Sequence, residues 1–182
     1  RRGAFHDYVT QAVLIAKHIP GTPVKLLWPR EEDMMHGRYP PVTQCKLVGA
    51  FDASNTLIGL HVRIAGQSIL SAVRPEALQQ GRDPLVFQGL NPSGEFAIGY
   101  SVPNLLIDHA MRNTHVPPGF WRGVNLNQNA IYLECFIDEI AHATKQDPLA
   151  LRRKLIQDPK RLAVLNAVAE RIGWERPAAD VG

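Results

Sequence analysis

The chain has 182 residues, 45% of them hydrophobic and 20% charged, and its formal net charge is +3 at pH 7. A chain of this length buries about 70% of its unfolded surface, so it can fold as one domain without disulfides or metal ions. Its low charge and ordinary apolar fraction exclude an intrinsically disordered chain. No apolar run approaches the roughly 20 residues of a membrane span, and no Lys/Arg-rich run marks a nucleic-acid site.

The first 70 residues predict a helix followed by strands. Apolar residues with helical spacing predict a helix over Asp7–His18, with Asp7 as its N-cap. The apolar face of this helix consists of Val9, Ala12, Val13 and Ala16. Residues 24–28 predict a short buried strand, residues 30–36 a helical turn, and residues 46–51 and 57–69 an antiparallel hairpin. This order suggests an αβ unit whose helix packs on a sheet.

The rest of the chain divides into an irregular middle and a helical end. Residues 71–104 contain eight prolines and glycines and no periodic segment, and residues 105–109 predict one more strand. Helices are predicted over residues 128–144, 148–156 and 159–172, the last two because each opens at an Asp-Pro pair. The first of these helices has an apolar face formed by Leu133, Phe136, Ile137, Ile140 and Ala141.

These elements predict an α+β fold. It has a helix packed on mixed or antiparallel strands in the N-terminal half, a long irregular middle and a helical C-terminal third. We treat residues 1–182 as a single unit with three parts: an αβ part with a hairpin (1–70), irregular loops and strands (71–124), and helices (125–175).

Common catalytic and metal-binding motifs are missing from the sequence. The seven histidines lack metal-site spacing, and Cys45 and Cys135 cannot by themselves form a disulfide framework or a metal cluster. Cys135 falls among apolar residues and is expected to be a buried, inert thiol. Glu134 and Asp138 lie one helical turn apart; they are a weak candidate for a catalytic pair, and hydrogen bonding to loops is their expected use. Motifs of serine hydrolases, P-loop enzymes and dinucleotide-binding folds are also missing.

Residues 117–129 form the most unusual segment. Their sequence, PPGFWRGVNLNQN, carries two aromatic residues and one arginine through a proline- and glycine-rich loop into a predicted helix. Free N–H groups at a helix N-terminus favour an anion, and Arg122 would add a charged, planar donor. The alternative is a braced loop with Trp121 in the core and Arg122 paired with an acid. The residues alone leave both interpretations open.

Three motifs, in this order along the chain, carry a family resemblance. Arg1-Arg2 precedes the first predicted helix, residues 23–33 read PVKLLWPREED, and residues 120–123 read FWRG ahead of the helix that contains Glu134. Over residues 1 to about 156 the set resembles the large subunit of molybdenum hydroxylases, the superfamily of xanthine dehydrogenase and aldehyde oxidase. The form FWRG is most similar to isoquinoline 1-oxidoreductase beta subunits and related bacterial aldehyde dehydrogenases.

The resemblance implies part of the catalytic, molybdopterin-binding subunit of a bacterial oxidoreductase. Such enzymes hydroxylate N-heterocycles of the isoquinoline type, or aldehydes, with oxygen from water. The resemblance also implies molybdenum held by molybdopterin, as its cytosine dinucleotide, and electron transfer to a small 2Fe–2S subunit and in some relatives a cytochrome. The implied cofactor-binding residues are Arg122, Gly123, Trp121, Phe120, Gln128, Arg1 and Arg2. Arg122 and Gly123 would lie beside the metal centre, and Arg1 and Arg2 at the entrance to the substrate pocket.

Two departures limit what carries over from the family. The family's catalytic base is a glutamate in a glycine-rich motif far toward the C-terminus, and nothing matching it occurs before Gly182. No catalytic or metal-binding residue is therefore expected within the chain. The xanthine branch has a substrate-contacting glutamate near the position of Gly3, where this chain has no acid, and this disfavours purine recognition. We expect a piece of a longer protein that is inactive and binds no molybdopterin by itself.

A hypothesis that assigns the chain to another class of protein also stays open. A non-catalytic interaction domain could dock a partner through residues 71–104 and 117–128. An isolated small-molecule-binding domain is a third possibility, but nothing in the sequence supports it. Related proteins occur in the bacterial periplasm and in the cytoplasm, so the sequence leaves the compartment open, along with the substrate.

Overall fold

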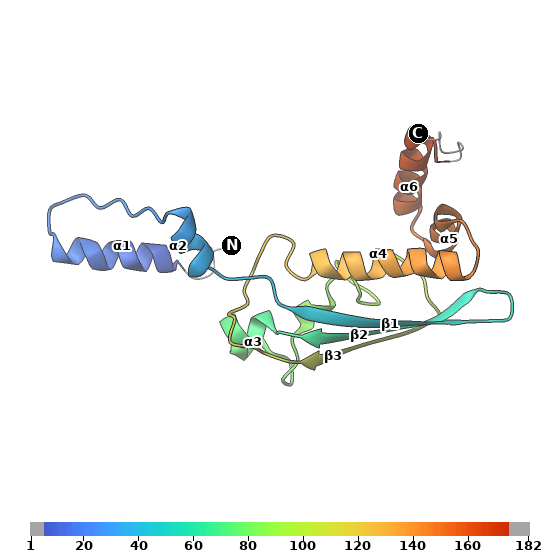
Figure 1. Ribbon diagram of the computed structural model, residues 1–182, viewed down its shortest axis with the longest axis horizontal. Helices are drawn as coiled ribbons and strands as arrows, with labels where there is room; N and C mark the ends of the chain where they lie inside the picture. Colours follow the sequence, from blue (N-terminus) through green and yellow to red (C-terminus); the bar gives the residue numbers. More distant parts are fainter. Residues whose placement is uncertain (1–5, 175–182) are drawn as a thin grey trace.

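A three-stranded mixed sheet forms the centre of the protein (Figure 1). The computed structural model describes residues 6–174. Strands β1 (Thr43–Phe51) and β2 (Leu57–Gly66) form the expected antiparallel hairpin. Strand β3 (Asn104–Met111) pairs in parallel with the other edge of β2, which is possible because the long segment between them crosses over. The sheet and the helices around it confirm the predicted α+β class.

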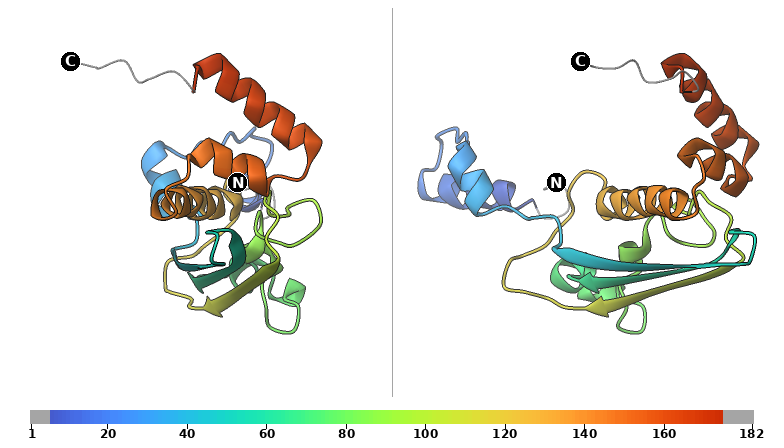
Figure 2. Two further views of the ribbon diagram at one scale, coloured as in Figure 1. Left: turned by 90° about the vertical axis from the view of Figure 1, so that its right-hand side faces the viewer. Right: turned by 45° about the vertical axis from the view of Figure 1, so that its right-hand side comes forward.

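Within the described residues, three helices follow the sheet. Helix α4 (Leu126–Ala143) lies lengthwise over one face of the sheet (Figures 1 and 2). Helices α5 (Pro148–Leu155) and α6 (Pro159–Ile172) follow it, and α6 extends away from the sheet. All three helices were predicted from the sequence and are confirmed.

The starts and the end of these last helices follow the expected capping rules. The carboxylate of Asp147 accepts the N–H of Ala150 at 2.8 Å, and that of Asp158 accepts N–H groups of the first turn of α6. Gly173 ends α6 in the left-handed conformation with a φ of 67°. Each Asp-Pro pair therefore starts its helix as the sequence indicates.

The core lies between the sheet and α4. Four β2 side chains contribute to it and are at most 3% exposed: Leu57, Leu60, Val62 and Ile64. Four side chains of α4 pack into the same cluster, all on the predicted face: Leu133, Ile137, Ile140 and Ala141. Burial of each large aliphatic side chain contributes about 1.5–3 kcal/mol, so sheet and helix hold each other in place.

The connection from β2 to β3 contains short helical elements. These are α3 (Ile69–Val73) and 3₁₀ turns at Pro75–Ala77 and Pro84–Phe87. The predicted second hairpin strand was extended too far, because β2 ends at Gly66 and not at residue 69. Ser68 ends the extended region by capping α3, and its Oγ accepts the N–H of Ser71 at 2.9 Å.

This connection also contributes to the core. Its buried apolar side chains are Val86, Leu90 and Tyr100. The carboxylate of Asp83 is fully buried and accepts hydrogen bonds from Ser68 Oγ and from the N–H groups of Leu70 and Leu85. Three donors offset the cost of burying this carboxylate, and they fix an otherwise irregular loop.

A separate helical unit precedes the sheet. Helix α1 (Asp7–His18) and helix α2 (Arg30–Met35) lie to one side of the sheet and away from α4, as Figure 1 and the right-hand view of Figure 2 show. No residue of α1 is buried, and Val9 and Val13 of its predicted apolar face are each nearly half exposed. Within residues 6–174, no helix is long and apolar enough to cross a membrane.

Three expectations for this unit were wrong. The helix does not pack on the sheet, and residues 24–28 form no strand, because no neighbouring strand lies beside them in residues 6–174. Asp7 is the first helical residue and not the N-cap; that position falls to His6, which has a φ of 46° and makes no side-chain cap. The helix itself and the short turn over residues 30–36 are confirmed.

Candidate functional site

The FWRG segment forms a tight turn directly before α4. The N–H of Val124 donates to the carbonyl of Trp121 at 2.8 Å, and the φ angles of Gly123 and Val124 are 84° and 51°. A Cβ at Gly123 would lie 2.1 Å from Asn127 Oδ1, and Asn127 Nδ2 donates to the carbonyl of Arg122 at 2.6 Å. Glycine is therefore required both by the backbone conformation and by the space that Asn127 occupies.

Two buried asparagines anchor this turn to the rest of the fold. Asn125 and Asn129 are each only 2% exposed. Asn125 Nδ2 donates to the carbonyl of Leu85 at 2.9 Å, and Asn129 Nδ2 donates to the carbonyls of Val86 and Gln88, each at 2.8 Å. This pair was not predicted from the sequence. Its signal is two amides four residues apart at the start of a helix, which can satisfy carbonyl groups of an irregular neighbouring segment.

A second contact holds the turn from the side of α2. The carbonyl of Tyr39 accepts the N–H of Gly119 at 2.9 Å, and the N–H of Tyr39 donates to the carbonyl of Pro117. A Cβ at Gly119 would lie 2.5 Å from Cβ of Arg38, so the two segments approach closely only because residue 119 is glycine. Two of the motifs singled out in the sequence, residues 23–33 and 120–123, are thereby joined through residues 38–39.

The structure places five of the seven predicted site residues in this turn and the first turn of α4. Phe120 and Trp121 are half-buried, and Arg122 is exposed. The Phe120 ring lies 5.4 Å from the guanidinium carbon of Arg74. The other two predicted site residues, Arg1 and Arg2, lie outside the described residues.

The alternative hypothesis for this segment, a braced structural loop, agrees with the structure only in part. Trp121 is not in the core, and Arg122 has no acidic partner within residues 6–174. Gln128, the fifth residue, is half-buried and its Nε2 donates to Asn125 Oδ1 at 2.7 Å. The loop is therefore braced by its buried asparagines.

The chemistry of the turn is that of a hydrogen-bond donor surface. The sequence contains no Asp or Glu between Asp108 and Glu134. The N–H groups of Asn127 and Gln128, in the first turn of α4, have no acceptor among the described residues. With the exposed guanidinium of Arg122 they offer positive charge and free donors, which suit an anionic or oxygen-rich ligand.

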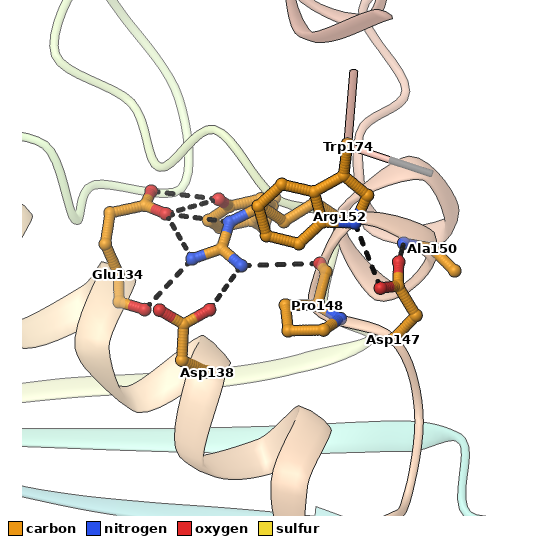
Figure 3. A network of polar contacts seen from close by, with 8 residues as sticks. Glu134, Asp138, Asp147, Pro148, Ala150, Arg152 and Trp174 are labelled. Atoms are coloured by element: carbon orange, nitrogen blue, oxygen red, sulfur yellow. Dashed lines mark hydrogen bonds and ion pairs between the residues drawn. The ribbon is translucent and has the colours of Figure 1, made fainter. Parts of the chain in front are cut away.

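Glu134 and Asp138, the candidate carboxylate pair, belong to a structural network (Figure 3). Arg152 on α5 donates to Asp138 Oδ1 at 2.6 Å and to Glu134 Oε2 at 3.0 Å, and Tyr100 donates to the Glu134 carboxylate. Burial opposes the charged form of Arg152, but its hydrogen bonds to the two carboxylates outweigh this effect and raise its pKa. Burial and the Glu134 hydrogen bond also raise the pKa of Tyr100. The pair thus holds α5 against α4.

In the part of the chain that the structure describes, the cysteines and histidines do not gather into a metal-binding cluster. Among residues 6–174, no group of three or more His, Cys, Asp or Glu side chains could hold a metal ion. Cys135 is exposed on α4, so the expectation of a buried thiol was wrong, because the residue lies just outside the apolar stripe. Cys45 is half-buried in β1, and burial raises its pKa to about 11.

On the sheet face turned away from α4, a small charge cluster crosses from β2 to β3. Asp108 accepts from Arg63 Nε at 2.6 Å and contacts His61 Nε2 at 2.7 Å. The Arg63 and His61 hydrogen bonds lower the pKa of Asp108. The three residues are paired with one another across the strands and leave no free nucleophile or base there.

The chain is similar to known proteins over more than nine-tenths of its length. The family model described as molybdopterin cofactor-binding domain matches residues 4–156, which end just after α5. The chain is 28% identical over 194 residues to a membrane-bound aldehyde dehydrogenase [pyrroloquinoline-quinone] of Gluconacetobacter polyoxogenes, covering 92% of this chain and 24% of that protein. It is 27% identical over 178 residues to the isoquinoline 1-oxidoreductase subunit beta of Brevundimonas diminuta, covering 94% and 22%.

Solved structures show the same fold. Quinoline 2-oxidoreductase from Pseudomonas putida 86 superposes with a TM-score of 0.68 at 18% identity, over 91% of this chain and 22% of that one. Aldehyde oxidoreductase from Desulfovibrio gigas superposes with a TM-score of 0.57 at 16% identity, over 83% and 18%. The chain spans about a quarter of the length of the curated relatives that it matches.

Proposed function

Because the chain belongs to the molybdopterin cofactor-binding domain family, we propose that it is part of the catalytic subunit of a bacterial molybdenum hydroxylase. The reaction we propose is hydroxylation of an N-heterocycle of the isoquinoline type, or of an aldehyde, with water as the source of oxygen. The names of the isoquinoline, quinoline and aldehyde oxidoreductases that it resembles support this substrate range. The observation that carries the proposal is the donor surface formed by Arg122 and the start of α4.

The residues of the turn fit a molybdopterin group chemically. Molybdopterin carries a phosphate and a pterin ring with polar edges, and both seek hydrogen-bond donors. Arg122 and the free N–H groups of Asn127 and Gln128 supply such donors without a competing carboxylate. We propose that the cofactor is the cytosine dinucleotide form, whose additional phosphate increases the demand for such donors.

The chain's own residues would position and shield the cofactor. When bound, the cofactor supplies two-electron oxidation of a carbon atom with oxygen taken from water. Arg122 would stabilise negative charge beside it, and Phe120 and Trp121 would form a wall that excludes water. The buried amides of Asn125 and Asn129 hold the turn to the loop at residues 85–88, so these groups stay in place. Arg1 and Arg2, outside the described residues, are proposed at the pocket entrance.

Other parts of the proposed enzyme lie outside this chain. The catalytic base is a glutamate that we place beyond Gly182, so the 182-residue chain alone is expected to be inactive and to retain no molybdopterin. Oxidation of substrate releases two electrons, which we assign to a small 2Fe–2S partner subunit and, further along, a cytochrome.

The test is elemental analysis of the full-length protein, co-expressed with its neighbouring genes in a bacterial host supplied with molybdate. About one molybdenum per chain, with iron on a copurifying partner, is the expected result. A folded full-length protein without either metal, and without a downstream glycine-rich glutamate motif, would instead support a non-catalytic docking domain that uses residues 71–104 and 117–128.

A pair of arginine variants tests the site itself in the full-length protein. Arg122→Ala should lower molybdenum content and turnover at least about 10-fold while the unfolding temperature changes little, since the side chain is exposed. Arg112→Ala is the matched control, because the guanidinium of that exposed arginine donates, within residues 6–174, only to the neighbouring carbonyl of Met111. Equal effects of the two variants, or an equal loss of fold and activity in Arg122→Ala, would contradict the assignment.

A further inference from the structure

Arg74 is an exposed arginine whose guanidinium lies over the Phe120 ring of the candidate site. Its guanidinium carbon is 5.4 Å from the ring centroid. Within residues 6–174 no acidic side chain pairs with Arg74, and Glu76, the acid nearest to it in sequence, forms no ion pair with it. A guanidinium over an aromatic ring still carries N–H groups at its edge, so Arg74 remains able to bind a planar oxyanion.

The backbone on both sides of this contact is held by hydrogen bonds. The N–H of Arg74 donates to the carbonyl of Leu70 at 2.8 Å, and the Arg74 carbonyl accepts the N–H of Ala77 at 2.9 Å. On the other side, the N–H of Gly119, next to the Phe120 ring, donates to the carbonyl of Tyr39 at 2.9 Å. The guanidinium is therefore attached to a fixed segment, and a donor fixed in this way loses less conformational freedom when a ligand binds.

Helix α3 and the loop that leads from β3 into α4 lie side by side at one end of the sheet (Figure 1). Asn113 of the loop joins them, because its Oδ1 accepts the N–H of Ser68 and its Nδ2 donates to Ser71 Oγ, each at 3.0 Å. Arg74 follows α3 directly, and Phe120 lies further along the same loop. The fold itself therefore places Arg74 beside the FWRG turn.

Arg74 adds a second arginine to the candidate site from a different element. In the proposed function, Arg122 and the free N–H groups at the start of α4 bind the anionic groups of the cofactor. Arg74 is not part of this set, since it belongs to the segment after α3 and reaches the site across the Phe120 ring. Its exposure suits a ligand that enters and leaves with each turnover better than a resident cofactor.

We propose that Arg74 binds a carboxylate of the substrate, so that the heterocycle or aldehyde oxidised by the full-length enzyme is an anion. This inference rests on the proposed function, in which Phe120 forms part of the wall of the site. A carboxylate accepts two parallel hydrogen bonds from a guanidinium, which orients the substrate as well as binding it. Arg74 is thus a specificity-determining residue and takes no part in the chemical step.

Matched pairs of substrates test the proposal on the full-length, molybdenum-loaded enzyme. The panel consists of quinoline and isoquinoline carboxylates and carboxybenzaldehydes, each compared with its neutral carboxamide of nearly equal size. We expect at least one carboxylate to have a kcat/KM about 10-fold or more above that of its carboxamide, because a charge-assisted bidentate contact discriminates by such a factor. A panel in which no carboxylate is preferred would overturn the proposal.

Substitutions of Arg74 assign the preference to this residue. In Arg74→Met the KM of the preferred carboxylate should rise about 10-fold or more, while its kcat and both constants for the carboxamide stay unchanged; Arg74→Lys should restore part of the loss. Arg82→Met is the matched control, since it removes the same charge from an exposed turn of the same connection. A preference that survives Arg74→Met would overturn the proposal. Loss of molybdenum from that variant would also overturn it, because Arg74 would then bind a phosphate of the cofactor.

Titration calorimetry with the same compounds separates this inference from the proposed function, because it measures binding without turnover. A molybdenum-loaded enzyme that binds and oxidises carboxylates and carboxamides equally would refute the role of Arg74 alone. A protein without molybdenum that binds a carboxylate, and loses this binding in Arg74→Met, would refute the hydroxylase and leave the carboxylate site standing.

Discussion

Two regions of the molecule, the sheet with its covering helix α4 and the α1–α2 unit, follow the same local rules of helix formation. They differ in how much of each helix is buried. Helix α4 and helix α1 both show apolar residues at helical spacing, and both form. Five residues of α4 are buried, whereas none of α1 is. The difference lies in the neighbour: α4 has the whole width of the sheet beneath it, and α1 has only the short segment after it. Periodicity therefore specifies a helix, and a second element is required before the helix contributes to stability.

The largest expected effect is on the free energy of unfolding of an α4 variant, and comparing it with an α1 variant tests this difference directly. Ile137→Ala on α4 should lower the free energy of unfolding by about 3–4 kcal/mol, because its fully buried side chain leaves a cavity against the sheet. Val13→Ala, the counterpart on α1, should change it by no more than about 0.5 kcal/mol, since Val13 is already 49% exposed. Urea unfolding measures both. Similar losses for the two variants would mean that α1 is packed as firmly as α4.

What the sequence predicted well depends on contacts near in the chain. The C-terminal helices start at Asp147 and Asp158 because a side chain two or three residues away satisfies their first N–H groups. The hairpin and the apolar face of α4 follow from periods of 2 and 3.6 residues. The aromatic and arginine turn was also located correctly, since prolines and glycines marked its bounds.

What the sequence did not predict depends on partners distant in the chain. Whether residues 24–28 pair as a strand is decided by a neighbour and not by their own composition. The burial of Asn125 and Asn129 depends on carbonyl groups some forty residues earlier. Cys135 is exposed because it lies at the edge of the apolar face of α4, where neighbouring positions around the helix face solvent and not the core.

The turn at the candidate site allows a sharper test of local packing. Gly123→Ala should cost about 2–3 kcal/mol, because residue 123 has a positive φ and the new Cβ would displace the Asn127 side chain from the Arg122 carbonyl. Gly94→Ala is the matched control: its φ is also positive, at 92°, but open space surrounds it, so about 1 kcal/mol is expected.

A double variant separates the two contributions at Gly123. Adding Asn127→Ala to Gly123→Ala removes the steric conflict, so part of the loss should be recovered relative to the sum of the single variants. Strict additivity in urea unfolding would show that Asn127 does not occupy the space beside Gly123.

The Arg152 network is expected to have a smaller effect than the core. Arg152→Met should lower the free energy of unfolding by about 2 kcal/mol, because Glu134 and Asp138 lose a charged donor while their partly exposed carboxylates regain water. Lys154→Met on the same helix is the control, since Lys154 is exposed and its ammonium bonds only Gln146 among the described residues. An Arg152 variant as stable as the Lys154 variant would remove this network from the interactions that hold α5 to α4.

The smallest effect concerns how a helix begins, and here the two regions differ again. Helix α5 starts with the Asp147 carboxylate on the N–H of Ala150, whereas α1 starts at His6 without a side-chain cap. Hydrogen bonds from that N–H and from the Trp174 indole hold the pKa of Asp147 below its usual range. The ionised cap therefore contributes fully above the unfolded-state pKa of about 3.9, and its contribution is lost as the pH falls through the lower folded-state pKa.

Two substitutions of Asp147 test this contribution. At pH 7, Asp147→Ala should lower the free energy of unfolding by about 1 kcal/mol. Asp147→Asn, which keeps an acceptor without a charge, should remove only the pH dependence. A difference between the wild type and the alanine variant that stays constant from pH 7 down to pH 2 would show that the charge of Asp147 contributes nothing to the start of α5.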